Sequence, residues 1–235
     1  MKKCMIMALM SLLTLTGMAQ QNDDERQGNI SVMDARYCMS YDDYVNNQWQ
    51  TVEKLQRITR TEGQLKWSGG GLYRFKKEDK EFDKKLKKEV FAIEFGDTLY
   101  INLYGLKHKG AYFGIGYNSC YRMENKIVFT ENYVSKKKNM AMGALAGAGG
   151  VFAGAIGGLA VGLADYSIHS QWAKHVCYIV DNNTKKVTLI DQETMPSLLA
   201  DHPDLLSKYD KVEGKKEKRS AATVMPLLLK AGIIK

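Results

Sequence analysis

The chain has 235 residues, of which 45% are hydrophobic and 26% charged, so it is long enough to bury one core and too apolar to be disordered overall. Its formal net charge is +8. The lysines stand in small scattered groups and form no aromatic-laced stripe, which favours a solvated basic surface and excludes a nucleic-acid-binding pattern.

The first nineteen residues have the pattern of a secretory signal peptide. Lys2 and Lys3 precede an apolar run from Met5 to Leu15, and Gly17 and Ala19 supply small residues at the −3 and −1 positions of a cleavage site. A short N-terminal anchor is the alternative, but the run is shorter than the ~20 apolar residues that a span needs. We therefore expect residues 1–19 to be removed and the mature protein to be exported to the periplasm or cell envelope.

A loose polar leader is predicted over residues 20–42, and an amphipathic helix after it. From Asp43 to Arg60 the apolar residues recur at spacings of three and four, as on one face of a helix; they are Val45, Trp49, Val52, Leu55 and Ile58. The glycine-rich stretch 68–71 then breaks the chain, and a charged segment follows it. Residues 43–139 are expected to hold this helix together with a sheet.

Alternation of apolar and polar residues predicts that sheet. Residues 90–95 and 98–104 alternate as half-buried strands do, and Gly96-Asp97 between them suits a tight hairpin. Residues 111–117 continue the pattern, with Gly114 and Gly116 indicating a bend or a close neighbour. With a fourth strand from Lys126, residues 90–134 are predicted to form a four-stranded antiparallel meander.

The segment 140–164 is the most unusual part of the sequence. It contains 25 residues without a charge, eight of them glycine and eight alanine. Glycines recur at intervals of four, a glycine zipper that lets helices approach closely; the predicted helix-packing residues are Gly143, Gly147, Gly150, Gly154, Gly158 and Gly162. Three interpretations stay open: a membrane helix or membrane-inserting hairpin, a hairpin packed within the protein or an oligomer, and a mobile loop.

Residues 165–235 are expected to complete the same domain. A second hairpin over 176–190 is too small to be stable alone and should extend the earlier sheet. Because a single membrane span would put a bilayer between the two, a segment that enters and returns fits better. Helices are predicted in the tail, interrupted at Pro203 and limited at Pro226. The predicted fold class is therefore α+β: an antiparallel sheet made of a meander and a later hairpin, flanking helices and a Gly/Ala-rich insertion.

The residues that could carry chemistry form no catalytic, cofactor or metal pattern. Cys38, Cys120 and Cys177 remain after cleavage, and widely spaced cysteines of odd number favour buried free thiols. A Cys120–His108 pair can be drawn, but a structural cysteine is the better interpretation. Histidines elsewhere in the chain are too far apart in sequence for a metal motif. Four tyrosines on or near the strands could form an exposed binding face, or could simply reflect strand propensity; they are Tyr100, Tyr104, Tyr112 and Tyr117.

These stretches resemble a family of small exported proteins of unknown function from Bacteroidota. The resemblance rests on the signal ending in AQ, on FAIEFGDTLYINLY and GYNSCY, and on the tail DNNTKKVTLIDQETMPSLLADHPDLLSKYD. It implies export and one compact domain, and it carries over no catalytic residue.

We therefore expect a non-enzymatic cell-envelope protein that associates with membrane, or with copies of itself, through the glycine zipper. The alternative is a soluble periplasmic binding module that uses its tyrosine-rich sheet face. No cofactor and no nucleic acid is expected in either case.

Overall fold

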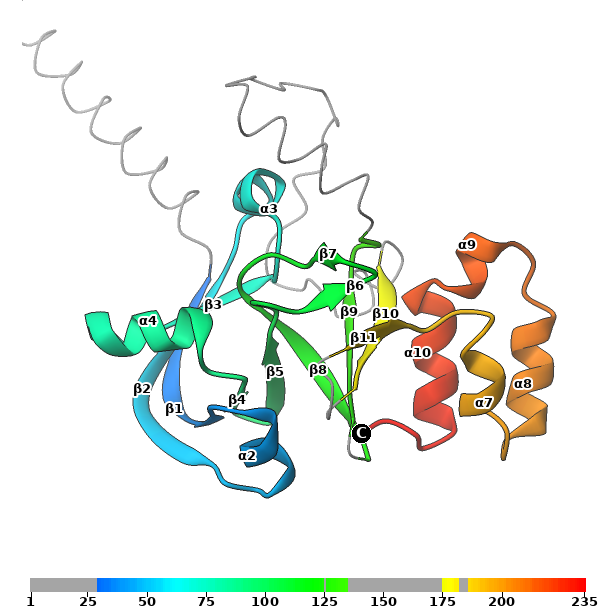
Figure 1. Cartoon of the computed structure of the whole chain (residues 1–235), viewed down its shortest axis with the longest axis horizontal. Coiled ribbons are helices and arrows are strands. Elements are labelled where there is room, and N and C mark those ends of the chain that lie inside the picture. Colours follow the sequence, from blue (N-terminus) through cyan, green and yellow to red (C-terminus); the bar gives the residue numbers. More distant parts are fainter. Residues whose placement is uncertain (1–28, 125, 135–174, 182–185) are drawn as a thin grey trace, which may run out of the picture.

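The computed structural model describes residues 29–124, 126–134, 175–181 and 186–235. Within this part, the fold is a nine-stranded antiparallel sheet with helices around it, which confirms the predicted α+β class (Figure 1). The sheet and most helices lie together, and the C-terminal helices form a separate layer on one side of the molecule (Figure 1).

Six of the strands close into a ring. In spatial order the ring runs β1-β2-β3-β8-β5-β4 and returns to β1, because β1 pairs with β4 and β8 pairs with both β3 and β5. The members are β1 (Ile30–Cys38), β2 (Gln50–Thr59), β3 (Tyr73–Lys76), β4 (Ala92–Phe95), β5 (Thr98–Asn102) and β8 (Tyr117–Met123). The interior of this ring of strands is filled with side chains, and its aromatic groups meet edge to face. The centroid of the Phe75 aromatic ring lies 5.3 Å from that of Tyr100 and 5.0 Å from that of Tyr117.

Beyond the ring, the sheet continues from β8 through β9 (Lys126–Glu131), β10 (Val176–Val180) and β11 (Val187–Leu189). The four-stranded meander is thus present as β4, β5, β8 and β9, and the later hairpin joins its edge as predicted. Its third strand is 117–123, not 111–117. Positive φ angles at Gly114 (98°) and Gly116 (106°) turn the chain there, and a small separate hairpin forms from β6 (Lys107–His108) and β7 (Ala111–Tyr112).

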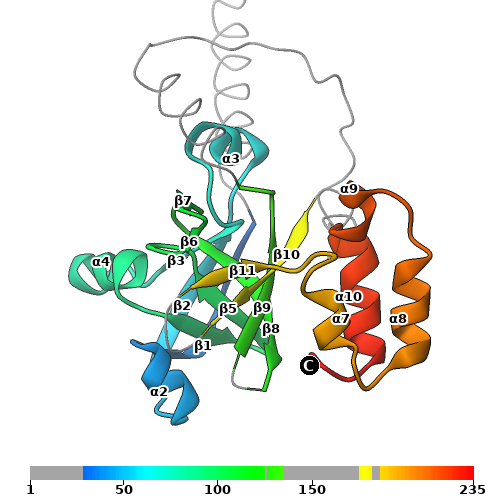
Figure 2. The same ribbon diagram turned by 45° about the vertical axis from the view of Figure 1, so that its right-hand side comes forward.

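The C-terminal helices cover one face of β9 and β10 (Figure 2). The layer consists of α7 (Met195–Leu198), α8 (Pro203–Asp210), α9 (Lys215–Lys218) and α10 (Ala221–Lys230). Pro226 does not end α10 as predicted, because it lies in the helix with its side chain exposed. Pro203 opens α8, where its missing N–H is not needed. The last residue is held by two backbone hydrogen bonds between Lys235 and Arg122.

The helix predicted over 43–60 is wrong. The chain forms a short helix, α2 (Tyr41–Val45), and then strand β2. Val52 and Leu55 are both buried three residues apart because a bulge intervenes: Ala35 faces Val52 while Met33 faces Leu55, and Lys54 adopts a φ of 49°. The bulge therefore gave the strand a helix-like spacing.

The predicted loose leader over 20–42 also needs correction, since it contains β1 and the start of α2. Two further helices flank the ring, α3 (Glu62–Ser68) and α4 (Lys80–Lys88). Residue Leu86 of α4 is buried with the aromatic side chains of the ring.

Candidate functional site

The two strands that border the Gly/Ala segment are direct neighbours. Val176, which opens β10, faces Glu131, which ends β9. The Tyr178 hydroxyl lies 3.1 Å from the backbone N–H of Val134, from which it accepts a hydrogen bond, and burial raises the pKa of Tyr178. The chain therefore leaves the sheet after β9 and re-enters it at β10 in the same place. We call this point, residues 131–134 and 175–176, the mouth.

The segment itself lies outside the described residues. This holds for all the glycines predicted to pack helices, which are Gly143, Gly147, Gly150, Gly154, Gly158 and Gly162, and for the predicted signal peptide. In the part of the chain that the structure describes, no helix is long and apolar enough to cross a bilayer.

The predicted tyrosine face is split by the ring. Tyr100 and Tyr117 are 2% exposed and point into the ring, whereas Tyr104 and Tyr112 are 44% and 55% exposed. The last two line an open depression of about 460 Å³ together with Gly105, Lys107, Gly114 and Ile115. We call these residues, with Lys109, the ledge. A binding face of four tyrosines is therefore wrong, because strand pairing turns half of them inward.

Close backbone packing holds the ledge against the rest of the molecule. A Cβ atom at Gly70 or Gly71 would come within 2.1 Å or 2.5 Å of the backbone of Ile115 or Tyr117, so a side chain cannot be added without a shift. Arg60 links the loop that contains Gly69 and Gly71 to the loop that contains Ile115. Its Nη1 donates to the carbonyl oxygens of Gly69 and Gly71 at 2.7 Å each, and to that of Ile115 at 3.3 Å.

Arg60 is 2% exposed, and its burial lowers the pKa of the guanidinium, which stays protonated at neutral pH. Sequence reasoning missed this residue because an arginine at the end of a strand has no local pattern. The signal for this close packing in the sequence is the glycine pair at 70 and 71, which by itself indicates only a break in the chain.

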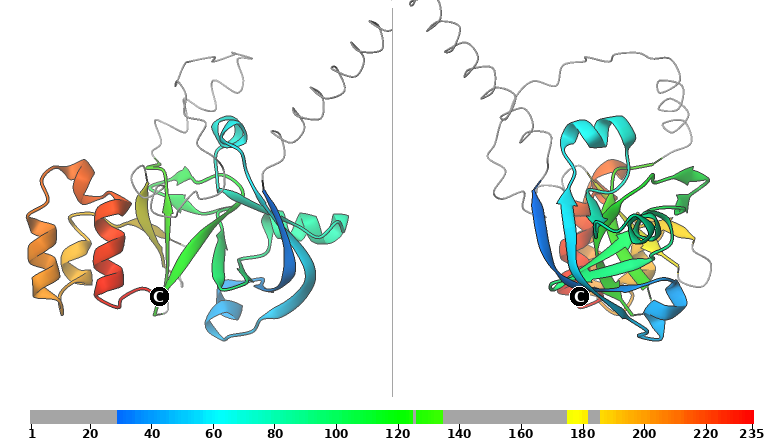
Figure 3. Two further views of the ribbon diagram at one scale, coloured as in Figure 1. Left: turned by 180° about the vertical axis from the view of Figure 1, so that it is seen from behind. Right: turned by 90° about the vertical axis from the view of Figure 1, so that its left-hand side faces the viewer.

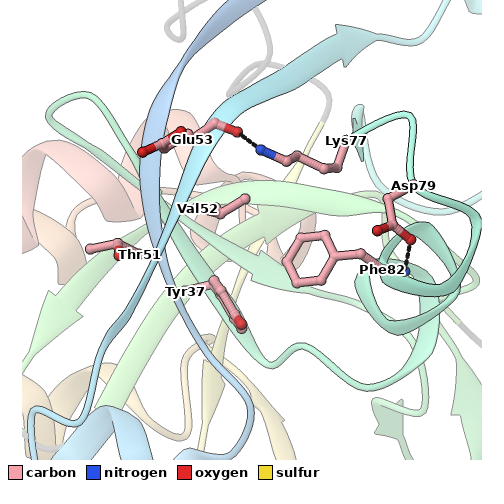
Figure 4. A pocket seen from close by; sticks show the side chains of 7 residues that line it. All are labelled: Tyr37, Thr51, Val52, Glu53, Lys77, Asp79 and Phe82. Carbon is pink, nitrogen blue, oxygen red and sulfur yellow. Dashed lines mark hydrogen bonds between the residues drawn. The ribbon is translucent and has the colours of Figure 1, made fainter.

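A second depression lies between β1, β2 and α4 (Figure 4). It measures about 400 Å³ and is lined by Tyr37, Thr51, Val52, Glu53, Lys77, Asp79 and Phe82. Its polar groups are engaged locally: the Lys77 ammonium donates to the Glu53 carbonyl oxygen, and the Asp79 carboxylate caps α4 by accepting from the backbone N–H of Phe82. The depression presents few groups that are aimed at a ligand.

The cysteines are buried free thiols, as predicted. Burial raises the pKa of Cys38 to about 12 and also raises the pKa values of Cys120 and Cys177. Because the thiolate is the nucleophile, these protonated thiols are inert at neutral pH. Cys120 and His108 have different partners: Cys120 Sγ lies 3.5 Å from the Leu99 carbonyl oxygen, and His108 Nδ1 lies 3.0 Å from that of Val187.

The described residues contain no group of three histidine, cysteine or acidic side chains placed to hold a metal ion. The charged side chains that do meet form a small cluster on the outside of the ring. Glu94 forms ion pairs with Arg36 and Arg122, whose guanidinium groups lie 5.6 Å and 5.8 Å from the centroid of the Trp49 ring. This cluster ties β1, β4 and β8 to the loop before β2.

The sequence pattern of a family of unknown function, DUF6563, matches residues 36–235. The chain belongs to this family. The match covers the ring from the middle of β1, the sheet extension and the C-terminal helices, so the DUF6563 pattern includes both ends of the mouth and the ledge. No curated protein and no solved structure matches this DUF6563 chain.

Proposed function

We propose that this protein is a non-enzymatic, exported component of the cell envelope, and that residues 140–164 associate with membrane, or with copies of the chain, as a segment that enters and returns. The observation that carries this proposal is the pairing of Val176 with Glu131. Neighbouring strands lie about 4.8 Å apart, so both ends of the intervening segment start from one place. A single span would leave its ends on opposite sides of a bilayer, so the pairing supports a segment that returns to the side from which it started.

The composition of the segment supports a shallow hairpin. Its 25 uncharged residues divide into two arms of about 12, and a helix of that length measures about 18 Å, little more than half of the ~30 Å hydrocarbon core. Lipid offers no hydrogen-bond partner to the backbone at the turn. Close packing of glycine faces between hairpins of several copies would shield it, so membrane association and self-association support each other in this proposal.

The non-enzymatic part of the proposal rests on the residues that the sequence offered for catalysis. Cys120 is buried with a raised pKa and a backbone partner, and His108 is 4% exposed against Val187 and Tyr178. Both side chains are buried, which supports a structural role for them. Export is supported by the pattern of residues 1–19.

A soluble binding module is the second candidate, and the exposed pair Tyr104 and Tyr112 favours it. In that case the Gly/Ala segment would pack in a soluble assembly, and the ledge would hold the ligand. The two candidates differ in whether the mature protein remains with the membrane.

The test is an alkaline carbonate wash of cell envelopes combined with chemical cross-linking. We expect the wild type to stay in the pellet and to cross-link into oligomers. Gly154→Leu/Gly158→Leu should abolish the oligomers, because leucine separates the helices, whereas Gly149→Leu/Gly157→Leu adds the same leucines off the main stripe and should retain them. Full release of the wild type would overturn the membrane role, and unchanged oligomers in the first variant would overturn the zipper.

A further inference from the structure

The ledge and the mouth lie at one end of the molecule. Figures 1 and 2 show the β6–β7 hairpin and α3 at the same end of the molecule as the end of β9 and the start of β10, with α2 at the opposite end. The view from behind agrees (Figure 3). Arg60 connects the two places: it donates to the carbonyl oxygen of Ile115 in the ledge, and its positive charge interacts electrostatically with Glu131 at the mouth.

The ledge presents aromatic and cationic groups outward on a rigid support. Lys109 and Gly110 have φ angles of 48° and 78°, as the tight turn of a two-residue hairpin requires. Residues His108 and Ala111 of this hairpin are buried, so Lys107 and Tyr112 opposite each other face outward. The Lys107 ammonium lies 4.5 Å from the centroid of the Tyr112 ring.

The mouth repeats this combination. Tyr133 is 36% exposed, and the Arg219 guanidinium lies 4.2 Å from its ring centroid. In the sequence, Lys136 to Lys138 follow two residues after Val134 and directly precede the uncharged segment. Basic and tyrosine side chains thus occur both on the ledge and at the point where the uncharged segment begins.

We propose that the ledge, together with Tyr133 at the mouth and the Arg219 guanidinium that lies over its ring, is the surface by which this protein lies against a bilayer that carries anionic lipids. Tyrosine prefers the membrane interface because its ring is apolar and its hydroxyl is polar, and lysine is attracted to anionic headgroups. A segment that enters a bilayer at the mouth would bring the ledge to the headgroups, since both lie at one end. This inference rests on the membrane form of the proposed function.

The test uses the full mature chain with one introduced cysteine that carries an environment-sensitive fluorophore. The native thiols are buried with raised pKa values, so labelling goes to the introduced position. Tyr112→Cys places the label on the ledge, where the aromatic fluorophore takes the place of the tyrosine ring, and Val45→Cys places it on α2 at the other end, at an exposed residue. The probe is a vesicle of equal parts phosphatidylcholine and phosphatidylglycerol.

We expect the emission at position 112 to shift to the blue when the vesicles are added and the emission at position 45 to stay unchanged. Lys107→Glu/Lys109→Glu should weaken vesicle binding about tenfold or more, since each lysine near an anionic surface adds attraction. Lys84→Glu/Lys87→Glu on α4 changes the net charge equally and should have little effect, so it separates local contact from overall charge.

Failure of the ledge and failure of the proposed function give different results. In one outcome the protein resists carbonate and binds vesicles while the emission at position 112 stays unchanged or shifts as much as that at position 45. This result would overturn the proposal that the ledge contacts the bilayer, and the proposed insertion of residues 140–164 would still stand. A protein that neither binds vesicles nor resists carbonate overturns both.

Discussion

The ring and the C-terminal helical layer each have a buried core, but they are held together differently. Inside the ring, buried polar side chains form hydrogen bonds: Asn102 Nδ2 donates to the carbonyl oxygens of Leu86 and Val90 at 3.2 Å and 2.8 Å. Arg57 donates from Nη1 to the Tyr100 hydroxyl at 2.6 Å, although its Nε is buried without a hydrogen-bond partner among the described residues. The core of the helical layer is almost entirely apolar, and its main polar atom, the Tyr209 hydroxyl, is buried without a hydrogen-bond partner among the described residues.

The difference shows which interactions position each region. Hydrogen bonds are directional, so the ring and its glycine loops are fixed in one geometry, which in turn places the ledge. The helical layer depends on the apolar area that it buries against β9 and β10, which stabilises without specifying direction. Substitutions that remove polar contacts should therefore cost most in the ring, and those that remove volume should cost most in the helical layer.

The largest expected effect is at Arg60. Arg60→Met leaves the carbonyl oxygens of Gly69 and Gly71 without their Arg60 donor, whereas that of Ile115 keeps its hydrogen bond from the Gly71 N–H at 2.9 Å. Each desolvated polar group costs ~1–3 kcal/mol, so the unfolding free energy should fall by about 2–6 kcal/mol. The measurement is urea unfolding of the mature chain. Arg74→Met, on an exposed residue of β3, is the control and should stay within about 0.5 kcal/mol. Equal losses in the two variants would contradict the assigned role of Arg60.

A slightly smaller effect is expected from removing volume in the helical layer. Leu228 is fully buried, and Leu228→Ala should lower the unfolding free energy by about 2–5 kcal/mol through lost burial and the cavity that remains. Its neighbour Leu229 is 41% exposed, so Leu229→Ala should change stability by less than about 0.5 kcal/mol. Thermal or urea unfolding of both variants checks this, and a large loss at Leu229 would show that α10 packs by another face.

The smallest expected effect distinguishes the two regions most directly. Tyr117→Phe removes a hydroxyl that donates to the Leu86 carbonyl oxygen and should cost about 1–2 kcal/mol. Tyr209→Phe removes the unpartnered hydroxyl and should leave stability unchanged or raise it by up to about 1 kcal/mol. Both substitutions remove one tyrosine hydroxyl, so a lower unfolding free energy in Tyr117→Phe alone, measured by urea unfolding, would show that the two regions differ. An equal loss in both variants would contradict this difference.

The predictions from sequence succeeded where the pattern was local. Period-two alternation gave the β4–β5 hairpin around Gly96-Asp97, and the lone later hairpin was correctly expected to extend the sheet. The thiols of Cys38, Cys120 and Cys177 were correctly expected to be buried and free. The glycine zipper and its partner remain predictions, since they fall outside the described residues.

The predictions failed where distant parts of the chain decide the outcome. The bulge at Lys54 made β2 look helical, because it needs β1 as a partner before its spacing has any meaning. Closure of the ring places Tyr100 and Tyr117 inside it. Alternation along a strand separates two faces but does not show which of them will be enclosed. The position of Arg60 depends on four carbonyl oxygens, those of Gln64, Gly69, Gly71 and Ile115, the last of them more than fifty residues away.

The amino-acid sequence by itself determined three of the four strands of the meander, the later hairpin and the uncharged Gly/Ala segment, because strand alternation and composition are properties of consecutive residues. The tertiary structure alone decided that β1 closes a ring, that two tyrosines stay on the surface, and that β9 and β10, on either side of residues 135–174, are direct neighbours. These depend on which strands become neighbours, and pairing between residues far apart in the chain is a choice that local preference leaves open.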